Sequence, residues 1–287
     1  ILGRLVGSEM CIRDSLKKTI RNFMGSFFMS SYPIGFFDSG IGGITLWKKI
    51  TSLLPNENTI YISDKKNCPY GEKSKKEIDE ISIYNSRFLI DRNCKIIVVA
   101  CNTATTNSIS KLRSKFKVPF IGIEPAIKPA ALNSKTKKVG VLATKGTLTS
   151  NLFFKTSSDQ IADVELINTY GEGLIELIEK GDCENELNVL LKKYLIPMID
   201  YGIDQLVLGC THYPLIKDSI KNIVGEGINV VDCNDAVAMQ TKRILELNNL
   251  MHNNTLDLPN HCFFNSGEDD ISIKEILQNN YEIFKFE

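Results

Sequence analysis

Two cysteines stand at similar places in the chain, each directly after an apolar run that predicts a buried strand. Cys101 follows the run 98–100, and Cys210 follows the run 206–209. A helix is expected to begin just after Cys101, and its first backbone N–H groups should lower the cysteine pKa from about 8.5 toward neutrality. Each cysteine alone fits a plain packing residue equally well, because Cys is among the most buried residue types.

Cys210 differs from Cys101 in having a histidine two positions later, His212. An imidazole beside a thiol can take up or return its proton, or can hold the thiolate ionised. The alternatives are a histidine satisfied by backbone groups and a metal pair. The metal pair is disfavoured, because no further ligands stand at zinc spacing from this Cys-x-His and the chain has only 3 His. We therefore expect no metal site.

Two more loops carry polar residues. Residues 35–43 predict a strand, a tight glycine loop and a helix start, with Asp38 and Ser39 in the loop. Position 45 is Thr, where a dinucleotide fingerprint needs Gly, and no P-loop lysine follows, so both nucleotide interpretations fail. An anion-receptive loop remains, and Asp38 could also simply cap the next helix. In the second loop, Tyr70 could present a hydroxyl and Gly71 an unobstructed backbone N–H to a ligand. The alternative is that both belong to an ordinary surface turn.

Composition narrows the class of protein. The 287 residues include 34 basic and 34 acidic side chains, so there is no electrostatic footprint for nucleic acid or an anionic membrane surface. No run approaches the roughly 20 apolar residues that cross a bilayer, and no secretory signal stands out. The 8 cysteines form no dense disulfide pattern, which suits a reducing compartment. We expect a cytoplasmic enzyme or binding protein that contacts neither nucleic acid nor membrane.

The chemistry-bearing residues must be positioned by an α/β fold, because short apolar runs alternate with helical patterns from residue 34 onward. The expected strands are 34–37, 59–62, 95–100, 119–123, 138–143, 164–167, 205–209 and 228–231. Several end in polar loops, where ligands collect beyond the carboxyl edges of parallel strands. The recurrence of an apolar strand followed by Cys-Asn-Thr or Cys-Thr-His predicts two similar halves.

The halves can be delimited along the chain. The segment 124–129 contains two prolines, which interrupt strands and helices, and is the expected first crossing; a second should follow Val231. The first α/β domain then comprises residues 29–125 plus 232–287, with helices at its C-terminal end, and the second comprises 126–231. Residues 1–28 follow neither pattern and resemble a translated adapter, so we expect them to be extraneous, with Met29 as the natural start.

Four strings taken together resemble the glutamate racemase family: Phe-Asp-Ser-Gly-Ile-Gly-Gly, Pro-Tyr-Gly, Ala-Cys-Asn-Thr-Ala-Thr and Gly-Cys-Thr-His-Tyr-Pro. The likeness runs from about residue 33 to 232. It implies two pseudo-twofold-related α/β domains with mostly parallel sheets, an active site in the cleft between them, and no cofactor. It also implies that Cys101 and Cys210 are the catalytic acid/base pair. The expected glutamate-binding residues are Asp38, Ser39, Tyr70, Gly71, Asn102, Thr103, Thr144, Thr211 and His212.

Supporting roles follow from the same resemblance. Asp38 is expected to assist Cys101, and His212 to assist Cys210. Glu179 is the expected counterpart of a family glutamate, although this chain has Tyr-Gly-Glu at 170–172 where the family often has Cys-Pro. Cys68 is expected to be incidental. The resemblance further implies interconversion of L- and D-glutamate, supply of D-glutamate for peptidoglycan, and a homodimer as the candidate assembly.

Three other functions compete with this interpretation. A related racemase acting on aspartate or another amino acid would share the fold. A non-catalytic binding module would also have two α/β lobes around a cleft, but the paired cysteines and the missing signal peptide argue against it. A thiol-redox protein is disfavoured, because the sequence contains no Cys-x-x-Cys pair.

Overall fold

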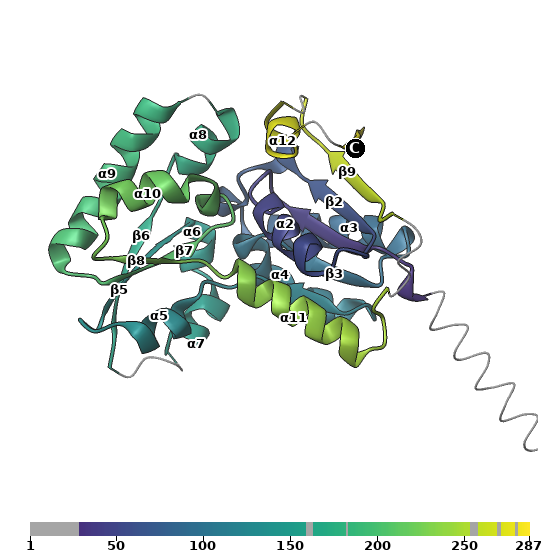
Figure 1. The fold of residues 1–287 in the computed structure, drawn as a ribbon, viewed down its shortest axis with the longest axis horizontal. Coiled ribbons are helices and arrows are strands. Elements are labelled where there is room, and N and C mark those ends of the chain that lie inside the picture. Colours follow the sequence, from purple (N-terminus) through teal and green to yellow (C-terminus); the bar gives the residue numbers. More distant parts are fainter. Residues whose placement is uncertain (1–28, 159–162, 182, 253–257, 269–270, 279–280) are drawn as a thin grey trace, which may run out of the picture.

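The computed structural model describes residues 29–287 apart from 159–162, 182, 253–257, 269–270 and 279–280, so the expectation for residues 1–28 lies outside it. The chain forms two lobes, each built on its own parallel sheet (Figure 1). We call the lobe with the six-stranded sheet the first lobe and the lobe with the four-stranded sheet the second lobe. The predicted α/β class with two mostly parallel sheets is confirmed.

The first-lobe sheet has the order β10-β9-β2-β1-β3-β4, and every neighbouring pair is parallel. Its strands are β1 (Ile34–Asp38), β2 (Thr59–Ser63), β3 (Ile96–Val99), β4 (Phe120–Gly122), β9 (His261–Asn265) and β10 (Ile283–Lys285). β1, β2 and β3 are buried along their whole length, as continuous apolar runs in a parallel sheet should be. The parallel pairing brings the residues after β1 and β3 to one edge.

The second-lobe sheet repeats this arrangement on a smaller scale. Its order is β6-β5-β7-β8, again all parallel, which is the same as β2-β1-β3-β4 in the first lobe. The strands are β5 (Lys138–Ala143), β6 (Glu165–Tyr170), β7 (Gln205–Gly209) and β8 (Asn229–Val231). Cys101 and Cys210 thus each follow the third strand of their lobe, and Asp38 and Thr144 lie at the end of the first.

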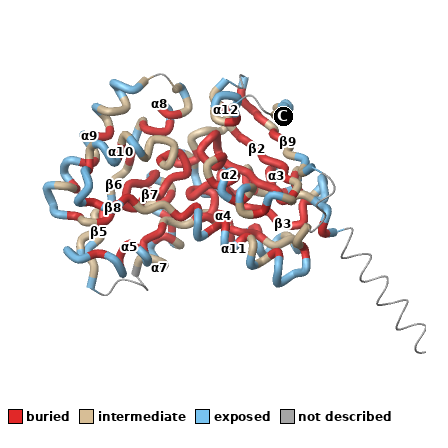
Figure 2. The backbone as a smooth tube through the Cα atoms, in the orientation of Figure 1, coloured by how far each residue is buried: buried red, intermediate tan, exposed pale blue. Residues whose placement is uncertain are grey.

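Helices cover both faces of the first sheet. They are α2 (Ile44–Leu53), α3 (Lys75–Asp91), α4 (Asn102–Lys115) and α11 (Asn234–Leu247). Alternate β1 residues face opposite sides: Ile34 and Phe36 share a hydrophobic cluster with α2 and α11, whereas Phe37 packs with α3 and α4. The central strands β1 and β3 of the first lobe and β5 and β7 of the second are buried, whereas β6 and β10 at the sheet edges and the outer helix faces are partly exposed (Figure 2).

The remaining helices lie around the second sheet or at the C-terminal end. They are α5 (Ile127–Asn133), α6 (Lys145–Leu148), α7 (Asn151–Ser158), α8 (Leu174–Lys180), α9 (Glu184–Tyr201), α10 (Lys217–Val224) and α12 (Ile271–Ile276). The chain leaves the first sheet after β4 and returns to it after β8, where α11 packs against α2. Within the described ranges, no helix is long and apolar enough to cross a membrane.

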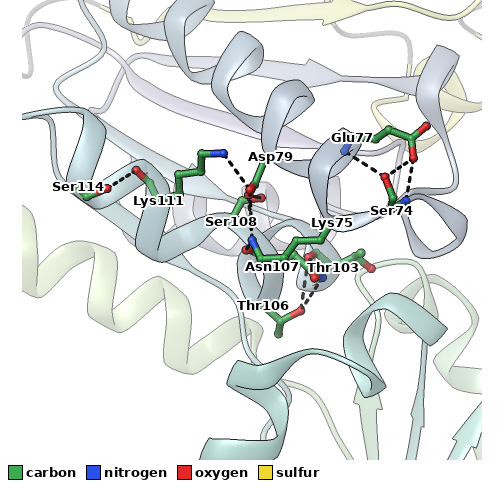
Figure 3. Close-up of polar contacts among 10 residues, drawn as sticks. All are labelled: Ser74, Lys75, Glu77, Asp79, Thr103, Thr106, Asn107, Ser108, Lys111 and Ser114. Atoms are coloured by element: carbon green, nitrogen blue, oxygen red, sulfur yellow. Dashed lines mark hydrogen bonds and ion pairs between the residues drawn. The ribbon is translucent and has the colours of Figure 1, made fainter.

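A buried carboxylate ties α3 to α4 (Figure 3). Asp79 of α3 accepts hydrogen bonds from Ser108 Oγ at 2.8 Å and Lys111 Nζ at 3.0 Å, both on α4. α3 itself begins at a capping box, in which the side chain and backbone of Ser74 exchange hydrogen bonds with Glu77. Because α4 starts directly after Cys101, these contacts fix the helix that presents the first cysteine.

All eight expected strands are present, but two strands were not expected. β9 and β10 extend the first sheet beyond β2, in a region where the sequence indicated only helices. β9 pairs with β2 from Thr59 opposite His261 to Ser63 opposite Asn265. Its sequence His-Cys-Phe-Phe-Asn has neither strict alternation nor a β-branched residue, so its strand character comes from pairing with β2.

A buried ion pair anchors the amino end of β3. The Lys95 ammonium pairs with the Glu57 carboxylate, and the two side chains are 0% and 2% exposed. Glu57 also accepts a hydrogen bond of 2.9 Å from the backbone N–H of His252, close to the C-terminal strands. Burial lowers the pKa of Lys95, and the charge of Glu57 opposes that shift. The pair therefore depends on both partners being present.

Replacing Glu57 by Ala tests this dependence. Loss of the carboxylate leaves the Lys95 ammonium buried without a counter-charge, so the free energy of unfolding should fall by about 3–5 kcal/mol in chemical denaturation. The matched control is Lys49→Ala, which removes the Lys49–Asp235 pair, whose side chains are 54% and 81% exposed. Because this pair is exposed to solvent, that change should leave the free energy of unfolding nearly unchanged. Equal losses in the two variants would show that the buried pair is not a structural anchor.

Candidate active site

The polar loops after β1, β3, β5 and β7 meet where the two lobes face each other. Hydrogen bonds of hydroxyl groups cross between the lobes here: Thr211 Oγ1 donates to Asp38 Oδ1 over 3.3 Å, and the Thr103 and Thr144 hydroxyls lie 2.8 Å apart. We call the buried residues at this junction the inter-lobe cluster. Its members are Asp38, Ser39, Cys101, Asn102, Thr103, Thr144, Cys210, Thr211 and His212, and none is more than 5% exposed.

Cys101 is the N-cap residue of α4, and its Sγ lies 3.9 Å from Ser39 Oγ. Burial raises the pKa of the Cys101 thiol well above its usual value, and the Asp38 carboxylate raises it further. Hydrogen bonds with the Ala104 N–H and with Ser39 oppose this shift without offsetting it. The expectation that the helix start would bring this pKa toward neutrality is therefore wrong, because exclusion of water outweighs the helix terminus. Cys101 holds its proton in this arrangement.

Asp38 lies beside Cys101 and is fully buried. Its Oδ2 accepts a hydrogen bond of 2.8 Å from the N–H of Gly43, the N-cap residue of α2. Asp38 therefore also binds the start of this helix, as the capping alternative predicted. Burial raises the pKa of Asp38, while the His212 charge and the N–H groups of Gly43 and Ser39 pull it back. A carboxyl group with a raised pKa near a thiol can exchange a proton with it.

The second cysteine belongs to a chain of three groups. Cys210 Sγ lies 3.8 Å from His212 Nδ1, and His212 Nε2 lies 2.7 Å from Glu179 Oε1. Burial alone would lower the pKa of His212, but contacts with Cys210, Cys68 and Glu179 outweigh it and raise the pKa well above its usual value. Burial likewise raises the pKa of Glu179, yet the His212 contacts lower it overall. His212 and Glu179 therefore form an imidazolium–carboxylate pair behind Cys210.

The glycines after β1 allow the lobes to approach closely. A Cβ at Gly40 would lie 1.9 Å from Glu179 Oε1, and one at Gly42 would lie 2.6 Å from the backbone N of His212. The backbone N–H of Ile41, between them, donates to Glu179 Oε1 over 2.8 Å. The glycine loop thus supports the pair that backs Cys210, a role that its sequence did not reveal.

The other expected binding residues divide into two groups. Thr103, Thr144 and Gly71 lie together, since a Cβ on Gly71 would be 2.9 Å from the Thr144 Cβ. Tyr70 is different: its hydroxyl donates to Asp64 Oδ2 over 2.6 Å. Asn102 Nδ2 donates to the Ile123 carbonyl oxygen over 3.2 Å. The hydrogen bonds of Tyr70 and Asn102 lie within the first lobe and stabilise the loops that line the site.

Cys68 is a residue whose position the sequence did not indicate. It lies in the loop after β2, between Asn67 and Pro69, and was expected to be incidental. In the structure its sulfur, a His212 ring nitrogen and a Glu179 carboxylate oxygen all lie within 4.8 Å of one another. Residues so far apart in sequence give no local signal, because only the closed lobes bring them together.

The arrangement is suited to proton transfer. Two thiols from equivalent strands lie in one buried cluster, and a charge on Cys210 contributes to raising the pKa of Cys101. Each has its own partner that can carry a proton, Asp38 on one side and His212 on the other. All seven cysteines within the described ranges are free thiols, as the absence of a disulfide pattern led us to expect. Paired acid/base groups of this kind can act on the two faces of one bound carbon.

Comparison with known proteins agrees with this geometry. The model of the Asp/Glu/hydantoin racemase family matches residues 43–241. The glutamate racemase of Ralstonia pickettii is 41% identical over 82% of this chain and 83% of its own length, and that of Clostridium perfringens is 43% identical over 87% and 95%. The crystal structure of glutamate racemase from Francisella tularensis, in complex with D-glutamate, superposes with a TM-score of 0.79 at 30% identity, covering 90% of this chain and 98% of that one.

The duplicated strand order, the one cysteine that each lobe brings to the inter-lobe cluster, and the matches over most of both chains lead to one assignment. The chain belongs to the glutamate racemases of the Asp/Glu/hydantoin racemase family.

Proposed function

We propose that this racemase interconverts L- and D-glutamate without a cofactor, with Cys101 and Cys210 as the two acid/base groups. The observation that carries the proposal is the placement of one thiol after the third strand of each lobe, inside one closed cluster. The substrate follows from the relatives, which are named glutamate racemases, and from the glutamate-bound neighbour.

The reaction needs a base on one face of the α-carbon and an acid on the other. The thiolate of one cysteine removes the α-proton and becomes a thiol, and the resulting carbanion takes a proton from the other cysteine, which becomes a thiolate. The roles reverse with the configuration of the substrate. Before the next turnover in the same direction, a proton must move from one thiol to the other. Asp38 on the Cys101 side and His212 on the Cys210 side are the groups that we assign to this return.

The carbanion has no organic electron sink, so the site itself must lower its energy. Fixed donors to the substrate carboxylates act most strongly in a water-excluded site. Among the cluster residues, Ser39, Asn102, Thr103, Thr144 and Thr211 carry the hydroxyl and amide groups suited to this, together with backbone N–H groups such as that of Gly71. Tyr70 contributes by positioning, because its hydroxyl is committed to Asp64.

Substrate entry requires the lobes to separate, because both cysteines are closed off from solvent. Separation must break the Thr211–Asp38, Thr103–Thr144 and Ile41–Glu179 contacts. Glu179 is then a positioning residue: it pairs with His212 inside the second lobe, and closure adds the Ile41 N–H that fixes its carboxylate. Closure couples formation of the acid/base cluster to exclusion of water.

The cellular setting is part of the same proposal. D-Glutamate made by this reaction would serve peptidoglycan synthesis in the cytoplasm, with glutamate as the only partner required for chemistry. A homodimer and the domain division at 125/126 and 231/232 stay predictions from the sequence.

Replacing either catalytic cysteine by Ser removes one thiol and nearly keeps its shape. Interconversion of L- and D-glutamate, followed by circular dichroism without added cofactor, should fall by about 10²- to 10⁴-fold in each variant. The unfolding free energy should change by less than about 1.5 kcal/mol. Cys262→Ser, at a half-buried thiol of β9, is the control and should keep the wild-type rate. Near-full turnover in Cys101→Ser or Cys210→Ser would contradict the two-thiol mechanism, and faster turnover of aspartate than of glutamate would favour the related racemase.

Gly42→Ala tests whether close approach of the lobes is needed. The new Cβ meets the Thr211–His212 backbone, which cannot turn aside as a flexible side chain can, so His212 should shift relative to Cys210. We expect kcat/KM to fall by about a hundredfold, with a stability loss of about 1–3 kcal/mol. The control is Gly227→Ala, where a Cβ has nothing within 4 Å. If both variants keep the wild-type kcat/KM, the glycine loop does not position the pair.

A further inference from the structure

Cys68 places a third thiol beside the pair that backs Cys210, and the mechanism above does not use it. Cys68 comes from the loop between β2 and α3 in the first lobe, whereas Glu179 of α8 and His212 after β7 belong to the second lobe. Each offers one ligand atom, and the sulfur, the ring nitrogen and the carboxylate oxygen lie within 4.8 Å of one another. The three groups therefore span the junction between the lobes.

The donor set has the chemistry of a zinc site. Zn²⁺ in proteins takes thiolate, imidazole and carboxylate ligands at about 2.0–2.3 Å, and sites with three protein ligands keep a fourth position open. To bind one ion, His212 Nε2 and Glu179 Oε1, now 2.7 Å apart, would exchange their mutual hydrogen bond for contacts with the ion, and the Cys68 sulfur would move toward them. Cys-x-His at 210–212 was set aside as a metal pair because no further ligands stood at zinc spacing. The closed lobes supply them from Cys68 and Glu179 instead.

A second observation points to a ligand at the same place. Glu179 Oε2 is buried and has no hydrogen-bond partner among the described residues, while Oε1 is held by the Ile41 N–H and His212. A buried carboxylate oxygen without a partner is costly unless something occupies its lone pairs. The N–H of Ile41 fixes the orientation of the carboxylate, as outer-shell partners do for metal ligands.

We propose that Cys68, His212 and Glu179 bind a thiophilic divalent cation, for which Zn²⁺ is the best match, and that the bound ion holds the lobes closed and stops turnover. Binding releases the Cys68 thiol proton and the His212 imidazolium proton to solvent. The ion takes the Nε2 position of the ring, which now faces Glu179, so the ring keeps a single proton on Nδ1 and can no longer take up a second one from Cys210. It also links the first lobe to the second, so the site cannot open for substrate. The inhibition rests on the proposed function, whereas the binding does not.

The test measures metal binding directly, on the full chain with reduced thiols. Co²⁺, titrated as a spectroscopic substitute for Zn²⁺, should give a thiolate-to-metal absorption band that saturates at one equivalent in the wild type. Zn²⁺ affinity, measured by competition with a chromogenic chelator, should fall by about 10- to 100-fold or more in Cys68→Ser. Cys262→Ser, the matched thiol control, and Cys101→Ser, which keeps all three ligands, should bind as the wild type does.

Activity gives the second readout. Zn²⁺ should inhibit the wild type and Cys262→Ser, and Cys68→Ser should need at least about tenfold more Zn²⁺ for the same fractional loss of its own rate. Wild-type protein without the thiolate–Co²⁺ band would overturn the proposal. The proposal would also be overturned if Cys68→Ser kept the wild-type Zn²⁺ affinity while Cys101→Ser lost it. That result would mean that the ion bridges the catalytic thiols. A chain that binds Co²⁺ through Cys68 but does not racemise glutamate would refute the proposed function and uphold the metal site.

Discussion

Burial of polar groups between two closing lobes is the constraint on which this structure depends. Asp38, Thr103 and Glu179 lose water when the lobes meet, and an unpaired polar group in that position costs about 1–3 kcal/mol or more. Each finds its partner across the junction, in Thr211, Thr144 and the Ile41 N–H. The closed form is therefore held by the same groups to which we assign roles in the proposed chemistry, and the glycines at 40 and 42 leave the room for them to meet.

The same burial sets the protonation of the site. Without water, Cys101 keeps its proton and Asp38 has a raised pKa, because desolvation penalises their charged forms. His212 departs from this trend, since its contacts with Cys210, Cys68 and Glu179 outweigh burial and raise its pKa. The two sides of the cluster thus differ, with a neutral thiol near a carboxyl on one side and a thiol near an ion pair on the other. A racemase must run in both directions, and in the proposed mechanism a different proton carrier on each side allows the two thiols to exchange roles.

Much of this was predictable from sequence, and what was missed has physical causes. The eight predicted strands carry strong local patterns, and the residues after them were expected to share sheet edges. β9 was missed because its strand character comes from pairing with β2. The thiol pKa was misjudged because helix termini are visible in a sequence, whereas loss of water is a property of the closed lobes. Cys68 and the glycine contacts with His212 depend on how the lobes meet, which no local pattern encodes.

The central claim is that two different thiols serve the two faces of one carbon, and isotope exchange in D₂O tests it most directly. Starting from L-glutamate, early turnover should place solvent deuterium at the α-carbon of the D-product, while recovered L-glutamate keeps its proton, because the base that removes a proton is not the acid that delivers one. D-Glutamate that retains the original α-proton would contradict the account. It would mean that a single group carries the proton from one face to the other.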